Sequence, residues 1–452
     1  MTDDSQILRA SYHTLGCKLN FSETSAVAMQ LARRNVIKAL PGETPDIVVV
    51  NTCSVTEVAD KKGRSLIRRL RQKWPEATLV VTGCYAQLKP EEVAEIEGVD
   101  IVLGNDEKLK ISEYLEAWEL DRRKRIEVHN FRDIKEFRGA CERGDRTRYW
   151  LKVQDGCDYF CTYCTIPFAR GRSRSGDIAT LVAEAESAAA EGGKEIVLTG
   201  VNVGCFGKDT GESFLDLLKR LDDVEGIERY RISSIEPNLL TEEIVHWIAT
   251  ESRAFMPSFH IPLQSGSDEV LRLMNRRYRT DIFRERIDMI RDMIPDAFIG
   301  VDIIAGARGE TMTEWERSFE FAASLPISRY HVFPYSERPG TKALAIDSTV
   351  SQEEKHRRVA LLTKLSDEKL RNYSRQYFQT VRNVLWEHPD SEDEGVMHGH
   401  TDNYLHVCAR ADKSLYNTIS PALLTGFHLG DSETISASLE CAADSFSIVS
   451  DK

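Results

Sequence analysis

Short apolar runs alternate with helical patterns in the first part of the chain. The runs ASYHTLG, DIVVVN and TLVVTG have strand length and many β-branched residues, and residues 21–34 and 56–72 between them have helical spacing. Ser22 and Thr56 stand where the N-caps of these two helices are expected. Because alternating strands and helices form a parallel sheet covered by helices, we expect an N-terminal parallel α/β sheet domain over residues 6–120.

The same alternation continues through the middle of the chain. Six consecutive strand and helix units with right-handed crossovers curve toward a barrel, which is complete at eight units. We therefore expect a central partial (β/α)6 barrel over residues 143–373. Its six strands are predicted at residues 148–154, 195–200, 229–234, 258–264, 297–306 and 328–335.

The last part of the chain changes to a period of two. After a long charged helical stretch at residues 350–380, apolar and polar residues alternate between turns that contain glycine. This pattern predicts a small all-β module, a barrel or a sandwich, over residues 376–441. The whole chain is therefore expected to be an α/β protein with a small C-terminal all-β module.

The composition is ordinary for a globular protein, with 41% hydrophobic and 29% charged residues. No apolar run approaches the roughly 18 residues that cross a bilayer, and the start of the chain lacks the basic and apolar regions of a signal peptide. We therefore expect a cytoplasmic location and no membrane partner. Since the cytosol keeps thiols reduced, the ten cysteines are expected to be metal ligands or free thiols.

The formal net charge of −13 argues at first against a polyanionic partner. Its distribution changes this interpretation, because residues 383–452 contain twelve Asp and Glu but only three Lys and Arg. The rest of the chain has four basic stretches, at residues 61–73, 121–125, 169–174 and 275–279. One such stretch is usual on a solvated face, whereas four predict a surface that contacts phosphates.

Three cysteines each follow a different strand of the N-terminal pattern, in TLGC, VNTC and VTGC. The carboxyl ends of parallel strands meet at one edge of a sheet, where ligands bind. Cys17, Cys53 and Cys84 can therefore converge. A single buried cysteine is common in a core, but three at equivalent strand ends favour a shared ligand.

A second trio, Cys157, Cys161 and Cys164, directly follows the first predicted barrel strand. Barrel enzymes place their chemistry on this face. A closed structural zinc site needs four ligands, and the loop offers no histidine and no fourth cysteine, whereas three suit a four-iron cluster with one open iron. An open iron can bind the amino and carboxylate groups of S-adenosyl-L-methionine, whose reductive cleavage yields a 5′-deoxyadenosyl radical.

Taken together, these motifs resemble the methylthiotransferases of the radical S-adenosylmethionine (radical SAM) superfamily. The resemblance rests on the cysteine triplet, with Tyr163 before its last cysteine, and on TLGCKLN, VNTCSVTEVADKK, VTGCYAQ, LTGVNVGCFG, RISSIEP, HIPLQSGSDEVLRLMNRRYR and HVFPYSERPGT. It extends over almost the whole chain. GCKLN is closer to the branch that acts on threonylcarbamoyladenosine in tRNA, the MtaB type, than to the isopentenyladenosine or ribosomal-protein branches.

The resemblance implies two 4Fe-4S clusters. Cys157, Cys161 and Cys164 would hold the radical-generating cluster, whereas the N-terminal trio would hold an auxiliary cluster that supplies or carries sulfur. The implied reaction uses two molecules of S-adenosylmethionine to place a methylthio group on C2 of threonylcarbamoyladenosine, at position 37 in the anticodon loop of tRNA. The implied partners are tRNA, an electron donor and a sulfur source, and the C-terminal module would be of the TRAM type.

Further site residues are expected at the strand ends. Candidate cofactor contacts are Tyr163, Asn202, Ser234, Glu236, Gln264 and Ser265. Candidate substrate contacts are Arg170, Arg172, Arg174, Arg308, His331, Tyr335 and Arg338. Arg170, Arg172 and Arg174 are expected to contact phosphates beside the radical cluster. Arg308 stands in GARGET, where the family commonly has GFPGET, and we expect it to meet the threonyl carboxylate of the substrate base.

The acidic C-terminal module departs from what tRNA binding requires, because nucleic-acid affinity depends on neutralised phosphates. We expect the module to use a basic or aromatic face around Arg382, Tyr404 and His406, or only to shape the site. The remaining cysteines, Cys141, Cys205, Cys408 and Cys441, are expected to be structural.

Two alternatives stay open at this point. One keeps the chemistry and changes the acceptor to isopentenyladenosine in tRNA or to a ribosomal-protein aspartate. The other is a non-catalytic tRNA-binding protein with structural zinc sites.

Overall fold

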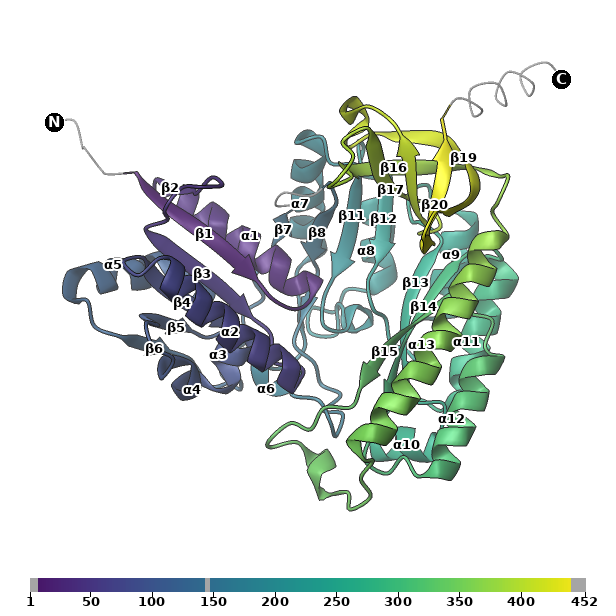
Figure 1. Cartoon of the computed structure of the whole chain (residues 1–452), viewed down its shortest axis with the longest axis horizontal. Coiled ribbons are helices and arrows are strands. Elements are labelled where there is room, and N and C mark those ends of the chain that lie inside the picture. Colours follow the sequence, from purple (N-terminus) through teal and green to yellow (C-terminus); the bar gives the residue numbers. More distant parts are fainter. Residues whose placement is uncertain (1–6, 143–146, 440–452) are drawn as a thin grey trace.

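The computed structural model describes residues 7–142 and 147–439. Figure 1 shows an N-terminal α/β domain beside a central core of strands and helices, and a small barrel at one end of that core. The domain limits expected from the sequence stay predictions, and three of them, residues 6, 143 and 441, lie outside the described residues.

The N-terminal sheet has six parallel strands in the order β2-β1-β3-β4-β5-β6. Its strands are β1 (Leu8–Thr14), β2 (Val36–Lys38), β3 (Ile47–Thr52), β4 (Thr78–Gly83), β5 (Ile101–Leu103) and β6 (Arg125–Glu127). Its helices are α1 (Lys18–Ala32), α2 (Glu57–Lys73), α3 (Cys84–Leu88), α4 (Pro90–Ala94), η1 (Glu107–Lys110) and α5 (Ile111–Asp121). Val48 and Val50 of β3 pack in one apolar cluster and Val49 in the other, which explains the unbroken apolar run.

The two helix starts predicted in this domain have different outcomes. Thr56 caps α2 as predicted, since its hydroxyl oxygen accepts a hydrogen bond from the Ala59 N–H at 3.1 Å. The prediction for Ser22 is wrong, because α1 begins at Lys18 and Ser22 lies inside it. The Ser22 hydroxyl instead donates to backbone carbonyls at the start of the core, those of Ala140 and Trp150.

The core contains the six predicted parallel strands and is a partial barrel, as expected. They are β8 (Tyr149–Lys152), β11 (Glu195–Thr199), β12 (Arg229–Ile232), β13 (Ser258–Gln264), β14 (Phe298–Ala305) and β15 (Arg329–Pro334). They form two sheets, β12-β11-β8-β7 and β13-β14-β15, joined by isolated bridges between Tyr230 and Phe255 and between Ser234 and His260. Strand β7 (Cys141–Glu142) is an antiparallel edge, and β9 (Gln154–Asp155) pairs with β10 (Arg174–Ser175).

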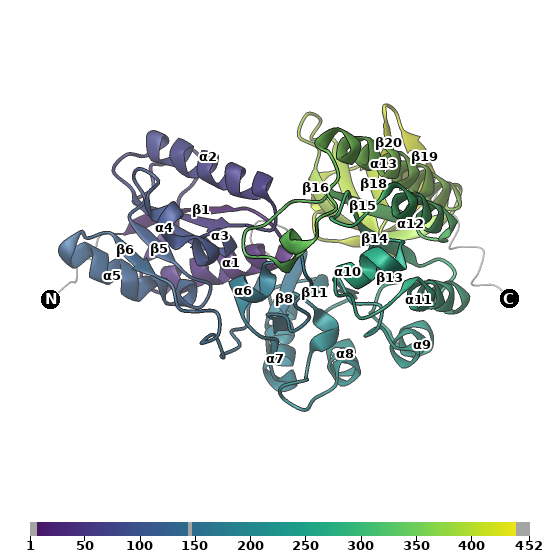
Figure 2. The ribbon, with the colours of Figure 1, turned by 90° about the horizontal axis from the view of Figure 1, so that it is seen from below.

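Helices cover the outside of the partial barrel (Figures 1 and 2). The helices of the core are α6 (Ile166–Arg170), α7 (Ile178–Ala190), η2 (Val203–Cys205), α8 (Phe214–Asp222), α9 (Glu242–Thr250), α10 (Asp268–Leu273), α11 (Thr280–Met293), α12 (Met312–Ser324), η3 (Lys342–Ala345) and α13 (Gln352–Arg375). Side-chain caps start many of them; Asp177, for example, accepts a hydrogen bond from the Thr180 N–H at 2.9 Å. Leu151, Leu198, Ile261 and Ile299 of the strands are fully buried under these helices.

The C-terminal module is a closed barrel in the order β16-β17-β18-β20-β19. Its elements are β16 (Val381–Pro389), β17 (Val396–Thr401), β18 (His406–Arg410), η4 (Lys413–Leu415), β19 (Ile419–His428) and β20 (Asp431–Ser438). Trp386 is fully buried in its centre, and Phe298 and Tyr373 from the core join the same apolar cluster. Of the two shapes predicted, the barrel is therefore the correct one.

Two buried arginines of β12 bind the module to the core. Arg229 donates to the carbonyls of Asn383 at 2.8 Å and His400 at 3.0 Å. Arg231 donates to the carbonyls of Thr401 and Asp402, both at 2.9 Å. These contacts fix one turn of the barrel above the strands of the core. Among the described residues, no helix is long and apolar enough to cross a membrane.

Candidate active site

The N-terminal trio of cysteines lies at the carboxyl edge of three neighbouring strands. Cys17 follows β1, Cys53 follows β3 and Cys84 begins α3 after β4. The approach depends on Gly16, where φ is +103° and an added Cβ would lie 2.7 Å from the Cβ of Cys53. Only glycine tolerates both this backbone conformation and this contact. The sheet therefore places the three thiols as the sequence predicted.

The second trio lies in the loop between β9 and α6, after the first strand of the partial barrel. Backbone N–H groups point at its sulfurs, from Tyr159 to the Cys157 Sγ at 3.5 Å and from Ile166 to the Cys164 Sγ at 3.4 Å. Burial raises the pKa of the Cys157 and Cys164 thiols to about 12. Such thiols ionise at neutral pH only beside a cation, which a bound metal supplies.

Both trios line one cavity of about 650 Å³, which we call the cluster cavity. Its walls contain Cys17, Cys53 and Cys84 from the N-terminal domain and Cys157, Cys161 and Cys164 from the core. The two sets of thiols therefore face the same space although they come from separate sheets.

Five of the six predicted cofactor contacts also line the cluster cavity. They are Tyr163, Asn202, Ser234, Glu236 and Gln264. The amide of Asn202 is 3% exposed, and neither its oxygen nor its nitrogen has a hydrogen-bond partner among the described residues. A buried amide left unpaired at a cavity wall fits a polar ligand such as S-adenosylmethionine. The geometry of the wall therefore fits the cofactor that the cysteine loop implies.

Ser265 does not belong to this wall. It is fully buried, and its hydroxyl points to that of Ser318 in α12. The strand bulges at Pro262 and Gln264, and Gln264 takes a left-handed φ of +67°. This bulge turns Gln264 into the cavity and Ser265 away from it, so the prediction for Ser265 is wrong.

Arg276 is a site residue that sequence reasoning did not identify. Its guanidinium is 7% exposed and donates to the Cys161 Sγ at 3.2 Å, to Glu236 and to the Tyr278 hydroxyl. Glu236 thus has a buried cationic partner, although burial still raises its pKa above the usual value. In the sequence, Arg276 lies in the basic stretch at residues 275–279 and in the motif HIPLQSGSDEVLRLMNRRYR, and neither signal indicates a contact with a cysteine of the second trio.

A second cavity of about 490 Å³ continues from the first toward the C-terminal module; we call it the module-side cavity. The two share Gly16, Cys17, Ser234, Asp302 and Phe333 in their walls. The module-side cavity also contains His331, as expected for a substrate contact, together with His260 and Tyr404. These residues make a passage from the module to the N-terminal trio.

Two histidines in this passage lie close together. The rings of His260 and His331 are 5.0 Å apart, and the His260 Nε2 lies 2.7 Å from the Asp302 carboxylate. Burial and the charge of His260 lower the pKa of His331 to about 4, so His331 is neutral at physiological pH. It can donate or accept one hydrogen bond to a substrate but offers no charge to it. Tyr335 lies in the cluster cavity, where its hydroxyl has no partner among the described residues.

The expected phosphate contacts of Arg170 and Arg174 are wrong. Arg170 is 1% exposed and donates to Glu23 at 3.0 Å, to Asp155 at 3.1 Å and to the Asn20 side chain at 2.7 Å. Arg174 donates to Asp155 at 3.0 Å and to backbone carbonyls. Both are buried, because they neutralise acidic groups inside the protein. Arg172 is exposed; it pairs with the surface Asp158 and lies over the Phe160 ring, and it stays a candidate.

Two further predicted substrate residues are also occupied within the protein. Arg338 is 4% exposed and donates to Asp60 and to the Ser54 hydroxyl, both at 2.7 Å, which holds the segment after Cys53. Arg308 donates to Glu337 at 2.8 Å and to the Ile346 carbonyl at 2.7 Å. Neither lines a cavity described above. The expected contact of Arg308 with a substrate carboxylate is therefore not supported.

A network of buried charges joins the N-terminal domain to the core; we call it the charge hub. Glu23 of α1 binds Arg170, Lys108 and Lys152, and Asp155 binds Arg170, Lys152 and Arg174. Burial alone would raise the pKa of Glu23, but the charges of Arg170, Lys108 and Lys152 hold it well below its usual range. Glu23 is therefore ionised, and the N-terminal domain is held to the core by its carboxylate.

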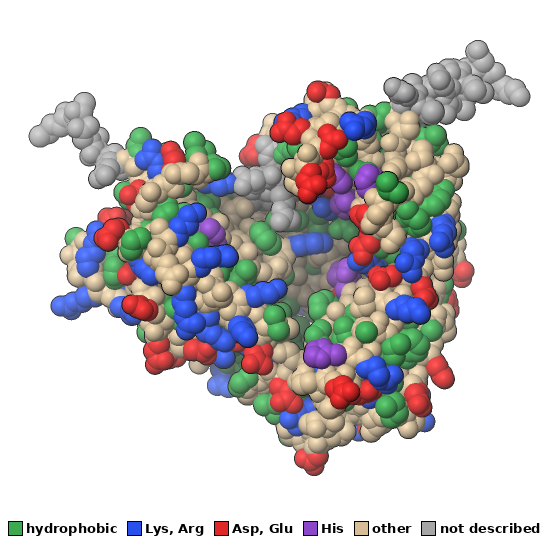
Figure 3. Space-filling model, viewed as in Figure 1, with side chains coloured by type: hydrophobic (Ala, Val, Ile, Leu, Met, Phe, Trp, Pro, Cys, Tyr) green, Lys and Arg blue, Asp and Glu red, His purple; other side chains and the backbone are tan. Residues whose placement is uncertain are grey.

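The module carries an aromatic row in place of a basic face. Cross-strand pairing places four histidine rings in a row, with 5.1–5.3 Å between the centroids of successive rings: His388, His398, His406 and His400. The Tyr404 ring continues the row, 5.2 Å from that of His400. Figure 3 shows histidine side chains gathered where the module borders the central hollow. Arg382 does not belong to this face, because it is held by Asp296 and Asp402.

Helix α2 carries a row of exposed basic side chains. Lys61, Lys62, Arg68, Arg69 and Lys73 are exposed and form no ion pair with a described residue. Figure 3 shows Lys and Arg side chains over α2 on the side of the hollow opposite the module. The stretch at residues 121–125 instead lies between α5 and β6, at the end of the domain away from the core (Figures 1 and 2).

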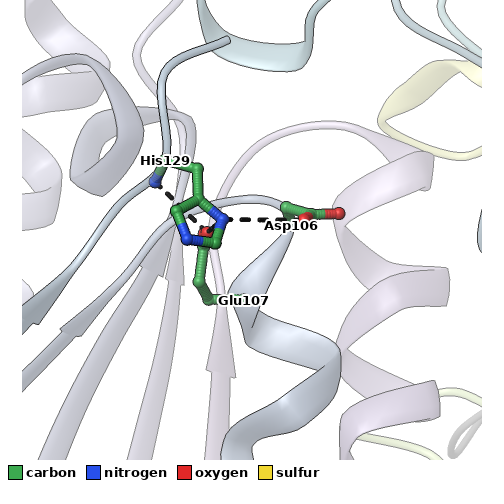
Figure 4. Close-up of side chains that lie close together, drawn as sticks. All are labelled: Asp106, Glu107 and His129. Atoms are coloured by element: carbon green, nitrogen blue, oxygen red, sulfur yellow. Dashed lines mark hydrogen bonds and ion pairs between the residues drawn. The ribbon is translucent and has the colours of Figure 1, made fainter. Parts of the chain in front are cut away.

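The other described cysteines lie outside the walls of both cavities. Cys205 is 1% exposed and packs behind the second trio, and Cys408 lies within the module. Cys141 is in the edge strand β7, and Cys441 is outside the described residues. One further cluster of metal-type ligands, Asp106, Glu107 and His129, is drawn in Figure 4; its members bind one another and line neither cavity.

A partial barrel with a C-x3-C-x2-C loop after its first strand defines a radical SAM protein. The description "Radical SAM superfamily" matches residues 151–322, and "Uncharacterized protein family UPF0004" matches residues 9–104. A solved radical S-adenosylmethionine methyltransferase, TsrM from Kitasatospora setae, superposes with a TM-score of 0.54 at 14% identity, over 74% of this chain and 77% of that one, and supports the fold.

The family is shown by curated relatives that match most of the chain. The Bacillus subtilis protein named threonylcarbamoyladenosine tRNA methylthiotransferase MtaB is 37% identical over 90% of this chain and 92% of its own length. The protein of the same name from Rickettsia prowazekii is 34% identical over 94% and 96%. A Clostridium tetani tRNA-2-methylthio-N(6)-dimethylallyladenosine synthase is 31% identical over 86% and 87%. The chain belongs to the methylthiotransferase family of radical SAM proteins, and the zinc-protein alternative is therefore not supported.

The first prediction concerns the stability that the charge hub provides. Glu23→Gln should lower the free energy of unfolding by about 3–5 kcal/mol, because three buried cations lose their shared counter-charge. Urea unfolding at neutral pH measures this change. The matched control is Glu228→Gln, which removes an exposed pair with Lys194 and should cost about 1 kcal/mol at most. Equal effects of the two substitutions would contradict the role of the hub.

Proposed function

We propose that this protein transfers a methylthio group to C2 of N6-threonylcarbamoyladenosine at position 37 of tRNA. The observation that carries the proposal is the cluster cavity, into which two separate trios of cysteine open. The relatives named MtaB supply the acceptor, because they match nearly the whole chain at 34–37% identity. The dimethylallyladenosine synthases match less closely, as the 31% identity of one of them illustrates.

Each trio would hold one 4Fe-4S cluster. Cys157, Cys161 and Cys164 would bind the cluster that accepts S-adenosylmethionine, and the N-terminal trio would bind the auxiliary cluster. When bound, the first cluster and S-adenosylmethionine supply the radical that activates the adenine C–H bond, which acid and base groups cannot break. The radical cluster is a property of the superfamily, whereas the auxiliary cluster is proposed from Cys17, Cys53 and Cys84 at one cavity wall.

The residues of the chain bind and orient the reactants in this scheme. Asn202 offers an unpaired amide to the cofactor, and Glu236 and Tyr163 line the wall beside the radical trio. Arg276 donates a hydrogen bond to the Cys161 sulfur and places a buried positive charge beside the radical trio. The protein would also need an external electron donor and a sulfur source, and it would act in the cytoplasm, where tRNA is found.

The substrate base would enter through the module-side cavity. A base in an anticodon loop is unpaired, so it can be turned out of the loop at modest cost. The aromatic row of the module leads to Tyr404 in the cavity wall, and flat rings of this kind stack on bases. His331 and His260 lie deeper in the same cavity. We propose that the module contacts the loop through these rings, although its overall charge is negative.

The RNA backbone would be bound by the opposite wall of the hollow. Helix α2 carries five exposed cations that form no ion pair with a described residue, and its N-cap Thr56 lines the cluster cavity. Phosphates bound along α2 would therefore place the loop at the cavity mouth, with Arg172 as a further contact. In this arrangement the N-terminal domain makes the ionic contacts with the RNA, and the module makes the stacking contacts.

The experiment that tests the proposed function uses Cys53→Ala. Anaerobically purified wild-type protein should contain about eight irons per chain and the variant about four, because one cluster is lost. The variant should still cleave S-adenosylmethionine but transfer no methylthio group to tRNA. Iron analysis, 5′-deoxyadenosine release and nucleoside mass spectrometry measure these outcomes. Cys408→Ala, a buried cysteine of the module, is the matched control and should behave as wild type.

Two outcomes would contradict the proposal of separable clusters. One is loss of both S-adenosylmethionine cleavage and sulfur transfer in a folded Cys53→Ala variant. The other is wild-type protein with about four irons in all and full transfer activity.

A further prediction concerns the exposed cations of α2. Arg68→Gln with Arg69→Gln should weaken tRNA binding and reduce the slope of log Kd against log salt concentration by roughly one to two, because phosphate contacts are lost. The matched control is Arg122→Gln with Arg123→Gln, an exposed arginine pair at the far end of the same domain. Equal slopes for the two double variants would show that α2 does not bind the RNA backbone.

A further inference from the structure

The two cavities contain several basic side chains, and all but one of them are neutralised. Arg170 is paired with Glu23 at 3.0 Å, Arg231 with Glu195 at 2.9 Å, and Arg276 with Glu236. Among the Lys and Arg residues described in these walls, Lys18 alone forms no ion pair with a described residue. The protein therefore keeps one uncompensated positive charge in the passage to the N-terminal trio.

The position of Lys18 is fixed by the same local structure that positions Cys17. Lys18 is the first residue of α1 and directly follows Cys17, in the turn after β1. Its side chain lines the module-side cavity, where His331 and Tyr404 also lie. Burial would raise the pKa of Tyr404, but the charges of Lys18, Arg148 and Arg231 lower it below its usual value. The charge of Lys18 therefore acts across the cavity.

A carboxylate that enters such a cavity loses its hydration and needs a cationic partner. The base in the proposed function carries one carboxylate, on the threonyl group attached at N6. Arg308, the residue expected from the sequence to meet it, is bound to Glu337 and lies outside the cavity walls. An isopentenyl group is apolar and would gain nothing from a nearby ammonium group.

We infer that Lys18 binds the threonyl carboxylate of the substrate base and thereby selects threonylcarbamoyladenosine over bases with an apolar N6 group. This inference rests on the proposed function and adds the group that recognises the substrate. A neutral or apolar N6 group forfeits the charge-assisted contact with the ammonium group, and the preference comes from that contact, because Lys18 is exposed in the free protein and stays hydrated beside a neutral analogue. Lys18 directly follows Cys17 of the N-terminal trio. The same contact therefore orients the base toward the proposed auxiliary cluster, which delivers the sulfur.

The test compares two anticodon stem-loop RNAs. One contains threonylcarbamoyladenosine, and the other contains the methyl ester of the same threonyl group, which has almost the same shape and no charge. Wild-type protein should methylthiolate the acid with a kcat/KM about 10–100-fold higher than the ester. Lys18→Met should lose this preference by reacting more slowly with the acid, whereas Lys18→Arg should keep most of it.

Because Lys18 adjoins Cys17, each variant is also checked for iron content and for S-adenosylmethionine cleavage without RNA, both of which should match wild type. A Lys18→Met variant that keeps the wild-type preference for the acid would overturn the inference. Equal rates of wild-type protein on acid and ester would overturn it without any variant. If wild-type protein does not methylthiolate the acid RNA at all, the proposed function itself fails, so the two failures are distinguishable.

Discussion

The structure depends on the buried ion pairs between Glu23 and the cations around it. An ionised carboxylate with 1% exposure persists only when its charge is matched, and here two of its partners, Lys152 and Arg170, belong to the core. The N-terminal sheet is therefore fixed against the partial barrel. Arg338 and Asp60 add a second buried pair between the same two parts. The consequence is that two trios of cysteine from different sheets open into one cavity.

A shared cavity explains how the two halves of the chain work together. The core supplies the open-iron site and the polar wall for S-adenosylmethionine, and the N-terminal sheet supplies the second set of thiols. In the proposed function the substrate base lies between them, and the module-side cavity is the passage that would lead there. The module and α2 then border the hollow from opposite sides, one with aromatic rings and the other with cations (Figure 3). An acidic module is compatible with an RNA substrate once the phosphates are assigned to α2.

Much of the fold follows from local pattern, and much of the site does not. All six barrel strands could be predicted, and so could the placement of six cysteines at one cavity, because apolar runs, strand ends and cysteine spacing are properties of nearby residues. The arginines could not, because a sequence shows a charge but not its partner. Arg170 and Glu23 are 147 residues apart, and Arg276 and Cys161 are 115 apart. The predicted cofactor contact of Ser265 is wrong for another reason, because a one-residue bulge reverses the face of the strand on which Ser265 lies.

The proposed methylthiotransferase activity is tested most directly by mass spectrometry of nucleosides from the tRNA of cells that lack this protein. It predicts that 2-methylthio-N6-threonylcarbamoyladenosine disappears, that N6-threonylcarbamoyladenosine accumulates in its place, and that the wild-type gene restores the original pattern. An unchanged nucleoside pattern would contradict this activity. So would a loss of the methylthio group from isopentenyladenosine alone.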